Sequence, residues 1–261
     1  MREEFTHVAA MRYTLATTEL LHLVKENHTY RELAKVTGLS ESELCRYDAG
    51  HILPSLARAE QLTRQLLSVA HLSDRIANEI ARDGDGYVDT TRIVTDPVIL
   101  ELAAQHAINE FKTSGITKVV TPSVDGVPLA TIIACRLSIH IVIAKTERER
   151  GVPDFIEAEY TTEGGLRMYL YMPRHVIQRN DSILLVDGMV RDYRMYVALS
   201  KALVQKTKAR IQGIFALMAR PNEWKTLCEH HAGITADVML QIPEEESLAN
   251  QRSATELRDQ P

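Results

Sequence analysis

Apolar residues recur three to four positions apart through the first 70 residues, which is the spacing of amphipathic helices. Two such apolar faces flank a central segment: Ala16, Leu20 and Leu23 in the first, and Ala59, Leu62, Leu66 and Val69 in the second. With two further short helices between them, these faces have enough apolar surface to share a small core. The pattern therefore predicts an N-terminal helical bundle.

The central segment has the pattern of two helices joined by a tight turn. Thr29 and Ser40 each stand three residues before a Glu, as in a capping box, where the hydroxyl and the carboxylate satisfy N-terminal N–H groups reciprocally. Between them, Gly38 suits the left-handed conformation that ends many helices. The second of these helices is predicted over roughly 41–49.

From residue 90 onward, short apolar runs alternate with helical segments. A helix is predicted to begin at Asp96-Pro97, a favourable N-cap and N1 pair. Further helices are predicted over 129–137, 195–207 and 223–231, and strands over 118–120, 139–144, 166–172, 183–186, 211–218 and 236–241. Strands that alternate with helices at this spacing imply a mainly parallel sheet with crossover helices.

The predicted fold class is thus α followed by α/β: a helical helix-turn-helix domain and then a mainly parallel α/β domain. We place the first domain at 1–72 and a linker helix and turn at 73–89, where glycines and aspartates break the helical pattern. The α/β domain takes 90–242. The polar tail 243–261 is predicted to be disordered.

Composition and charge restrict the function only loosely. Among 261 residues, 45% are hydrophobic and 25% charged, which are ordinary globular values. A net charge of −5 argues against a protein that coats nucleic acid, although a small local DNA-reading surface stays compatible with it. No apolar run approaches the roughly 18 residues of a membrane span, so we expect a cytoplasmic protein with no membrane partner.

The central N-terminal segment resembles the lambda-repressor-like helix-turn-helix family in the order Thr-Tyr-Arg-Glu-Leu-Ala, Thr-Gly-Leu-Ser and Glu-Leu-Cys-Arg-Tyr. The resemblance implies that 41–49 is a recognition helix in the major groove, with Arg46 placed for a bidentate contact to guanine. The residues expected to contact DNA are Thr29, Tyr30, Ser40, Glu41, Ser42, Arg46 and His51. The alternative is a helical hairpin used only for dimerisation. Nine Lys and Arg against ten Asp and Glu over residues 1–75 weaken the electrostatic case for DNA.

Residues 183–196 carry the most informative motif. Four aliphatics, Ile183 to Val186, are typical of a strand buried on both faces, and an acid follows at once. The stretch resembles the phosphoribosyl-pyrophosphate motif of type I phosphoribosyltransferases, which has four apolar residues, two acids, two apolar residues and a small loop around a glycine. The second acid is replaced by Gly188, and the small loop by 191–195, Arg-Asp-Tyr-Arg-Met.

That resemblance implies a sugar-phosphate site built from three loops. Residues 123–128, Ser-Val-Asp-Gly-Val-Pro, look like the pyrophosphate loop, where N–H groups at a helix N-terminus cradle an anion. The segment 146–165 looks like a flexible hood, and Asp187 takes the position that accepts hydrogen bonds from ribose hydroxyls in the family. The residues expected to bind the effector are Ser123, Val124, Asp125, Gly126, Lys145, Asp187, Gly188, Arg191 and Arg194.

The departures from the motif favour a sensor over an enzyme. Tyr193 and Met195 replace the glycine and threonine whose backbone wraps the 5′-phosphate, and Gly188 removes a carboxylate that stabilises the reaction's charges. Arg191 and Arg194 either offer charge to a phosphate or lie solvated on the loop. We therefore expect no catalytic residue, no metal and no enzyme activity. No cofactor is expected beyond a phosphoribosyl or nucleotide effector.

Taken together, the sequence predicts a homodimeric transcription regulator. Its partners would be a double-stranded DNA operator and a small phosphorylated metabolite that shifts the spacing of the recognition helices. The alternative is an active purine or orotate phosphoribosyltransferase with an added DNA-binding domain. A third hypothesis is an adaptor with an empty pocket that uses the α/β domain only to dimerise.

Overall fold

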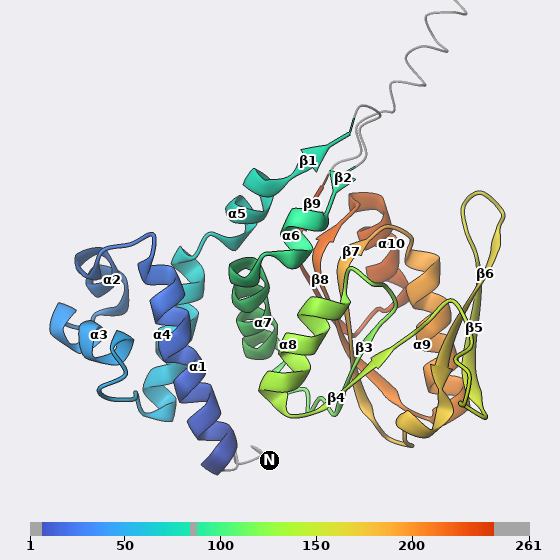
Figure 1. Ribbon diagram of the computed structural model, residues 1–261, viewed down its shortest axis with the longest axis horizontal. Coiled ribbons are helices and arrows are strands. Elements are labelled where there is room, and N and C mark those ends of the chain that lie inside the picture. Colours follow the sequence, from blue (N-terminus) through green and yellow to red (C-terminus); the bar gives the residue numbers. More distant parts are fainter. Residues whose placement is uncertain (1–6, 84–87, 243–261) are drawn as a thin grey trace, which may run out of the picture.

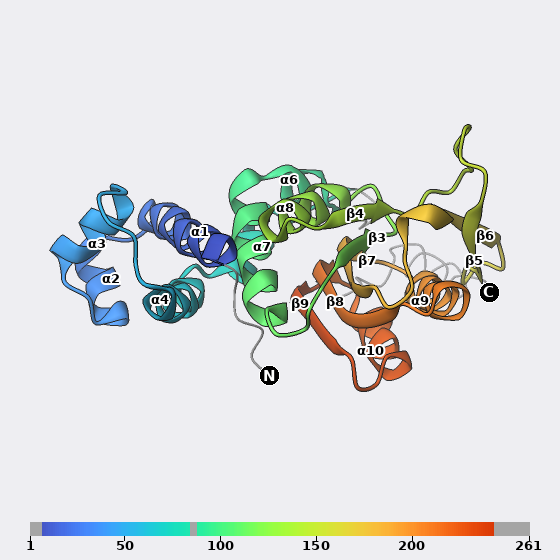
Figure 2. The same ribbon diagram turned by 90° about the horizontal axis from the view of Figure 1, so that it is seen from below.

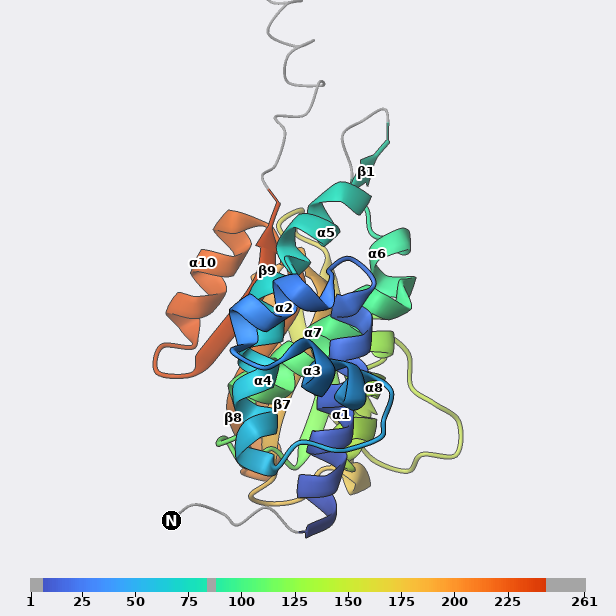
Figure 3. The same cartoon turned by 90° about the vertical axis from the view of Figure 1, so that its left-hand side faces the viewer.

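The computed structural model describes residues 7–83 and 88–242 (Figure 1). Five helices form the N-terminal part: α1 (His7–Lys25), α2 (Tyr30–Thr37), α3 (Glu41–Asp48), α4 (Leu56–Val69) and α5 (Leu72–Glu79). Their shared core contains Leu20, Leu33, Leu44 and Leu62, all essentially removed from solvent. The first four helices form the predicted bundle, with α2 and α3 at the far end of the molecule (Figure 3).

The turn between α2 and α3 follows the sequence pattern in part. Thr29 and Glu32 form a complete capping box, and Gly38 ends α2 in the left-handed conformation at φ 70°. Ser40 forms only half of the second predicted box: its Oγ accepts from the Glu43 N–H at 3.2 Å. The carboxylate of Glu43 instead accepts a hydrogen bond from the Tyr47 hydroxyl at 3.1 Å, so the reciprocal half was wrong.

The connection to the second domain contains a short helix and two short strands. His71 at φ 47° separates α4 from α5, and α5 ends at Glu79. Two short antiparallel strands then follow, β1 (Ala81–Arg82) and β2 (Val88–Asp89). Helix α5 packs against α7 and β9, where the Ser73 hydroxyl donates to the Met239 carbonyl at 2.7 Å. The linker helix is therefore docked on the α/β domain.

The second domain is a three-layer α/β/α structure. Its sheet has five parallel strands in the order β4-β3-β7-β8-β9, as the alternating pattern predicts. The strands are β3 (Lys118–Thr121), β4 (His140–Ile143), β7 (Ser182–Val190), β8 (Arg210–Ala219) and β9 (Thr235–Gln241). Helices α6 (Thr91–Thr95), α7 (Pro97–Phe111) and α8 (Val127–Leu137) lie on one face, and α9 (Tyr193–Thr207) and α10 (Pro221–His230) on the other (Figure 2).

The central strand β7 explains the run of four aliphatics. Leu184 and Val186 enter the core beneath α7 and α8, whereas Ile183 and Leu185 enter the core beneath α9 and α10. Apolar residues are therefore needed on both faces. The strand also continues to Val190, four residues past its predicted end, because its later residues pair with β8. Asp187 and Gly188 consequently lie within the sheet and not in a loop.

The segment 146–165, expected to be a flexible hood, has regular structure over part of its length. It contains β5 (Phe155–Thr161), which pairs with β6 (Arg167–Pro173) in an antiparallel hairpin that projects beside α9 (Figure 1). A single 3₁₀ turn, η1 (Arg174–Val176), follows the hairpin. Ile156 and Ala158 alternate with polar residues and are buried in the core beneath α9. This period of two was the overlooked signal.

Two further expectations concern membrane-spanning helices and the C-terminal tail. Across residues 7–83 and 88–242, no helix is long and apolar enough to cross a membrane. The predicted polar tail 243–261 lies outside the described residues.

Candidate functional site

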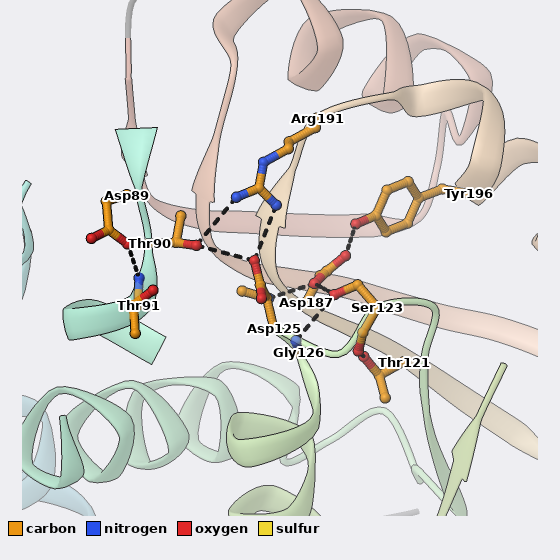
Figure 4. A network of polar contacts seen from close by, with 11 residues as sticks. Asp89, Thr90, Thr91, Thr121, Ser123, Asp125, Gly126, Asp187, Arg191 and Tyr196 are labelled. Atoms are coloured by element: carbon orange, nitrogen blue, oxygen red, sulfur yellow. Dashed lines mark hydrogen bonds and ion pairs between the residues drawn. The ribbon is translucent and has the colours of Figure 1, made fainter. Parts of the chain in front are cut away.

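The site lies at the carboxyl ends of β3 and β7, which are neighbours at the centre of the sheet (Figure 4). From β3 the chain continues to β4 on one side, and from β7 it continues to β8 on the other. Strand order thus reverses between β3 and β7. Open parallel sheets bind their ligands at such a switch point, beyond the carboxyl ends of the strands.

Asp187 is the centre of the polar contacts at this edge. Its side chain is fully buried. One carboxylate oxygen, Oδ1, accepts from the Ser123 hydroxyl and from the Gly188 N–H at 2.6 Å, and Oδ2 accepts from the Tyr196 hydroxyl. Burial raises the pKa of Asp187 because the charged form loses its water, and these donors oppose that shift. Asp187 therefore ties β7 to α9 and to the loop after β3.

The loop after β3 lies directly against β7. The Ser123 hydroxyl accepts from the Gly126 N–H at 3.1 Å, and its carbonyl accepts from the Thr121 hydroxyl at 3.3 Å. A Cβ at Gly126 would lie 2.9 Å from the Asp187 Cα, so only glycine permits this approach. Val124 is 84% exposed at the loop's tip. Helix α8 starts directly afterwards, and no side chain caps its N-terminus.

Arg191 connects the loop after β3 to Thr90, the residue that precedes α6. Its guanidinium donates to Asp125 Oδ2 at 3.1 Å and to the Thr90 hydroxyl at 3.2 Å, and the Thr90 hydroxyl donates to the same Asp125 oxygen at 3.1 Å (Figure 4). The side chain of Arg191 stays 43% exposed while it makes these contacts. Arg191 is held by the protein's own carboxylate.

The N-terminus of α9 is occupied by two carboxylates. The Asp192 side chain accepts from the Arg194 N–H at 2.9 Å, and Glu223 of α10 accepts from the Tyr193 N–H at 2.7 Å. The Arg194 guanidinium pairs with Asp192 at 3.2 Å and lies over the Tyr193 ring, which stacks on His230. Because a helix N-terminus favours anions, this end of α9 is neutralised, whereas that of α8 is not.

The surroundings of Gly188 leave no room for a larger side chain, which the sequence alone does not show. A Cβ at this position would lie 2.7 Å from the Asp125 carbonyl oxygen and 2.9 Å from a methyl group of Val94. The backbone of the loop thus fills the space that a second acid of the motif would need.

Restoring that acid is therefore expected to harm the protein. We expect Gly188→Asp to lower the free energy of unfolding by about 1–3 kcal/mol, the usual cost of overpacking a filled site. Urea unfolding measures the change. Gly164→Asp is the matched control, because a Cβ there meets nothing within 4 Å. Equal stability of the Gly188→Asp variant and the parent would contradict this account.

The structure brings together most of the residues expected at the sugar-phosphate site: Ser123, Asp125, Gly126, Asp187, Gly188 and Arg191. Lys145, which follows β4, lies outside this set of residues. Its ammonium group pairs with the carboxylate of Glu149 at 2.6 Å. Sequence reasoning missed Thr90, Tyr196 and Glu223. No local pattern identifies Thr90 or Glu223, whereas Tyr196 stands out as a tyrosine among the buried positions of α9.

No metal-ligand cluster accompanies the site. Within the described parts of the chain, no three His, Cys, Asp or Glu side chains gather closely enough to hold a metal ion.

The residues expected to contact DNA lie on α2, α3 and the loop after α3. Thr29 and Ser40 cap the two helices, and Glu41, Ser42, Arg46 and His51 are exposed. Tyr30 is directed inward: its hydroxyl donates to Asp48, which raises the pKa of Tyr30 well above its usual value. Its hydroxyl is therefore committed to a contact within the bundle.

Known proteins that are similar to this chain include several phosphoribosyltransferases. No family model matches the chain. Xanthine phosphoribosyltransferase of Agathobacter rectalis is 27% identical over 154 residues, which cover 57% of this chain and 80% of that protein. Hypoxanthine/guanine phosphoribosyltransferase of Methanocaldococcus jannaschii is 27% identical over 149 residues, 57% of this chain and 78% of that one. For the xanthine enzyme of Bacillus mycoides, the match spans 61% of its length at 25% identity.

Solved structures show the same fold. Adenine phosphoribosyltransferase from Thermoanaerobacter pseudethanolicus matches with a TM-score of 0.58 at 15% identity, over 65% of this chain and 99% of that one. The enzyme from Rhodothermus marinus matches with a TM-score of 0.55 at 21% identity, over 66% and 99%. The α/β domain therefore has the fold of these phosphoribosyltransferases.

These findings correct the functional prediction. The similar proteins are named as purine phosphoribosyltransferases, and none of the comparisons supports binding to a DNA operator. The expected transcription regulator, its operator, its sensory role and its lack of enzyme activity were wrong. The similarity favours the alternative, an active purine phosphoribosyltransferase. A capped pair of helices does not by itself establish a DNA-binding module. Nor does Gly188 in place of the second acid by itself indicate loss of catalytic activity.

Proposed function

Starting from the type I phosphoribosyltransferase-like domain, we propose that this chain is a purine phosphoribosyltransferase and that residues 90–242 form its catalytic domain. In the reaction, a purine nitrogen forms a bond to C1′ of phosphoribosyl pyrophosphate. The bond from C1′ to the pyrophosphate oxygen breaks, and the purine's proton passes to solvent. The observation that carries the proposal is the 27% identity spread over 80% of a xanthine phosphoribosyltransferase.

The leaving pyrophosphate would bind at residues 123–126. These residues precede the uncapped N-terminus of α8, where N–H groups and the helix dipole favour an anion. The guanidinium of Arg191, which contacts Asp125 in the same loop, supplies a cation beside it. Such fixed positive groups stabilise the charge that develops on a leaving pyrophosphate.

The 5′-phosphate would bind at the N-terminus of α9, which also begins at this edge of the sheet. For that, the carboxylates of Asp192 and Glu223 must release the N–H groups that they now accept from. Once its partner Asp192 moves, the Arg194 guanidinium becomes available to the phosphate.

The base is proposed to be a 6-oxopurine. Xanthine, hypoxanthine and guanine all belong to this class, and they appear in the names of the sequence relatives. The adenine enzymes share the fold at only 15% and 21% identity.

A direct assay tests this function. The purified full chain is given the magnesium salt of phosphoribosyl pyrophosphate with xanthine, hypoxanthine, guanine, adenine or orotate. We expect a nucleoside monophosphate from at least one 6-oxopurine, with pyrophosphate released in equal amount. Reactions without a base serve as controls for hydrolysis. The proposal fails if no purine yields a nucleotide, or if orotate alone does.

A further inference from the structure

Tyr196 joins three elements of the site through one carboxylate. It lies in the first turns of α9, and both it and Asp187 are fully buried. The Tyr196 hydroxyl donates to one oxygen of Asp187, and the Ser123 hydroxyl donates to the other (Figure 4). Helix α9, strand β7 and the loop after β3 are thereby linked in one chain of hydrogen bonds.

The hydroxyl of Tyr196 matters because the carboxylate has no access to water. An ionised carboxylate in such a place is costly unless several donors surround it. Burial already raises the pKa of Asp187, and the hydrogen bond from Tyr196 opposes that rise. Without that hydroxyl, Asp187 would bind a proton at higher pH than it does now.

Protonation of Asp187 would reach the loop through Ser123. The Ser123 hydroxyl donates to Asp187 and at the same time accepts from the Gly126 N–H at 3.1 Å. This double role fixes the backbone just before the N-terminus of α8. A neutral Asp187 accepts more weakly, so Ser123 would lose its fixed orientation and the loop its shape.

Other ionisable groups near Asp187 and Tyr196 come from each neighbouring element. Asp125 in the loop adds negative charge, which favours protonation of Asp187. Arg191 lies after β7 and is paired with Asp125, and its charge lowers the pKa of Tyr196. Tyr160 of β5 lies near Tyr196 and acts in the opposite direction. Tyr196 donates directly to the carboxylate, whereas these three groups act on the pair through space.

On this geometry we propose that Tyr196 is a positioning residue for the transferase reaction. It holds Asp187 so that, through Ser123, residues 123–126 keep the shape that receives pyrophosphate. The inference rests on the proposed function and adds a fully buried residue to the site.

Tyr196→Phe tests it, because phenylalanine keeps the ring in the core and removes only the hydroxyl. We expect the KM for phosphoribosyl pyrophosphate to rise about ten- to hundredfold, as on losing a hydrogen bond to a charged group, with a much smaller change in kcat. The acid limb of the pH profile of kcat/KM is expected to move to higher pH. Ser123→Ala should raise KM similarly, and the double variant should be no worse than the worse single one.

Tyr160→Phe is the matched control, since it loses a hydroxyl in the same region that makes no hydrogen bond to Asp187. It should leave KM and the pH profile unchanged. An acid limb that stays in place in Tyr196→Phe, whatever happens to its melting temperature, overturns the positioning role.

A binding measurement separates this inference from the proposed function. Calorimetric titration with inorganic pyrophosphate needs no turnover. We expect Tyr196→Phe to bind pyrophosphate more weakly than the parent, with the larger loss at acidic pH. Should the parent bind pyrophosphate in this way yet form no nucleotide, the proposed reaction fails while the role of Tyr196 stands. Equal pyrophosphate affinity of the two proteins overturns that role.

Discussion

Asparagine in place of Asp187 is expected to lower kcat/KM for phosphoribosyl pyrophosphate by about 10²–10³-fold, the usual cost of removing one preorganised polar group from an active site. The carboxylate accepts from Ser123, Tyr196 and the Gly188 N–H, whereas an amide has a single acceptor oxygen. The loop after β3 would lose its fixed orientation. Steady-state kinetics with varied phosphoribosyl pyrophosphate measures the loss, and activity within threefold of the parent would contradict it.

The same substitution should also change how the stability of the fold depends on pH. Burial raises the pKa of Asp187 in the folded state above the ordinary carboxyl value. The folded state therefore holds the proton more tightly, and stability falls as pH rises from that ordinary value through the raised one. Asparagine removes this dependence. The free energy of unfolding of the variant, relative to that of the parent, should therefore rise from acidic to neutral pH. A difference that is the same at both pH values in urea unfolding would refute the argument.

Glutamine in place of Glu223 is expected to lower the KM for phosphoribosyl pyrophosphate about tenfold, equivalent to about 1.4 kcal/mol. The carboxylate of Glu223 accepts the Tyr193 N–H at 2.7 Å, at the end of α9 where the 5′-phosphate is proposed to bind. Glutamine can still accept that hydrogen bond through its amide oxygen. It lacks the negative charge that repels an incoming phosphate.

Glu229→Gln is the control. Glu229 is exposed on the same helix, α10, and its substitution removes the same charge. It should leave KM unchanged. If Glu223→Gln raises KM, the carboxylate supports substrate binding and does not compete with it. If both variants lower KM equally, the effect is one of overall charge.

The predictability of this protein depended on how local each feature is. The caps at Thr29 and Asp96 were correctly placed because a cap involves side chains and N–H groups within one helical turn. The parallel sheet followed from the alternation of its elements. Strand β5 was missed because only two of its side chains, Ile156 and Ala158, are fully buried, and so short an alternation is a weak signal.

Function was harder to predict than fold. The resemblance to the phosphoribosyltransferase motif identified the domain, and the replaced second acid was then taken as a sign that catalysis was lost. The space at Gly188 is filled by the Asp125 carbonyl and Val94, so the glycine reflects packing at that point. From the sequence alone, an acid that is absent because catalysis was lost looks the same as one that is absent because the neighbouring backbone leaves no room for its side chain.

By itself, the sequence determined the order of the parallel strands and their crossover helices, the burial of β7 on both faces and the place of the candidate site at the strand ends, because these depend on periodicity and local propensity. Only the tertiary structure decided that Asp187 lies inside the sheet, bonded to Ser123, 64 positions away. It also brought Thr90 to Arg191 across 101 positions. Such contacts follow from how strands and helices pack, and no short-range pattern along the chain encodes them.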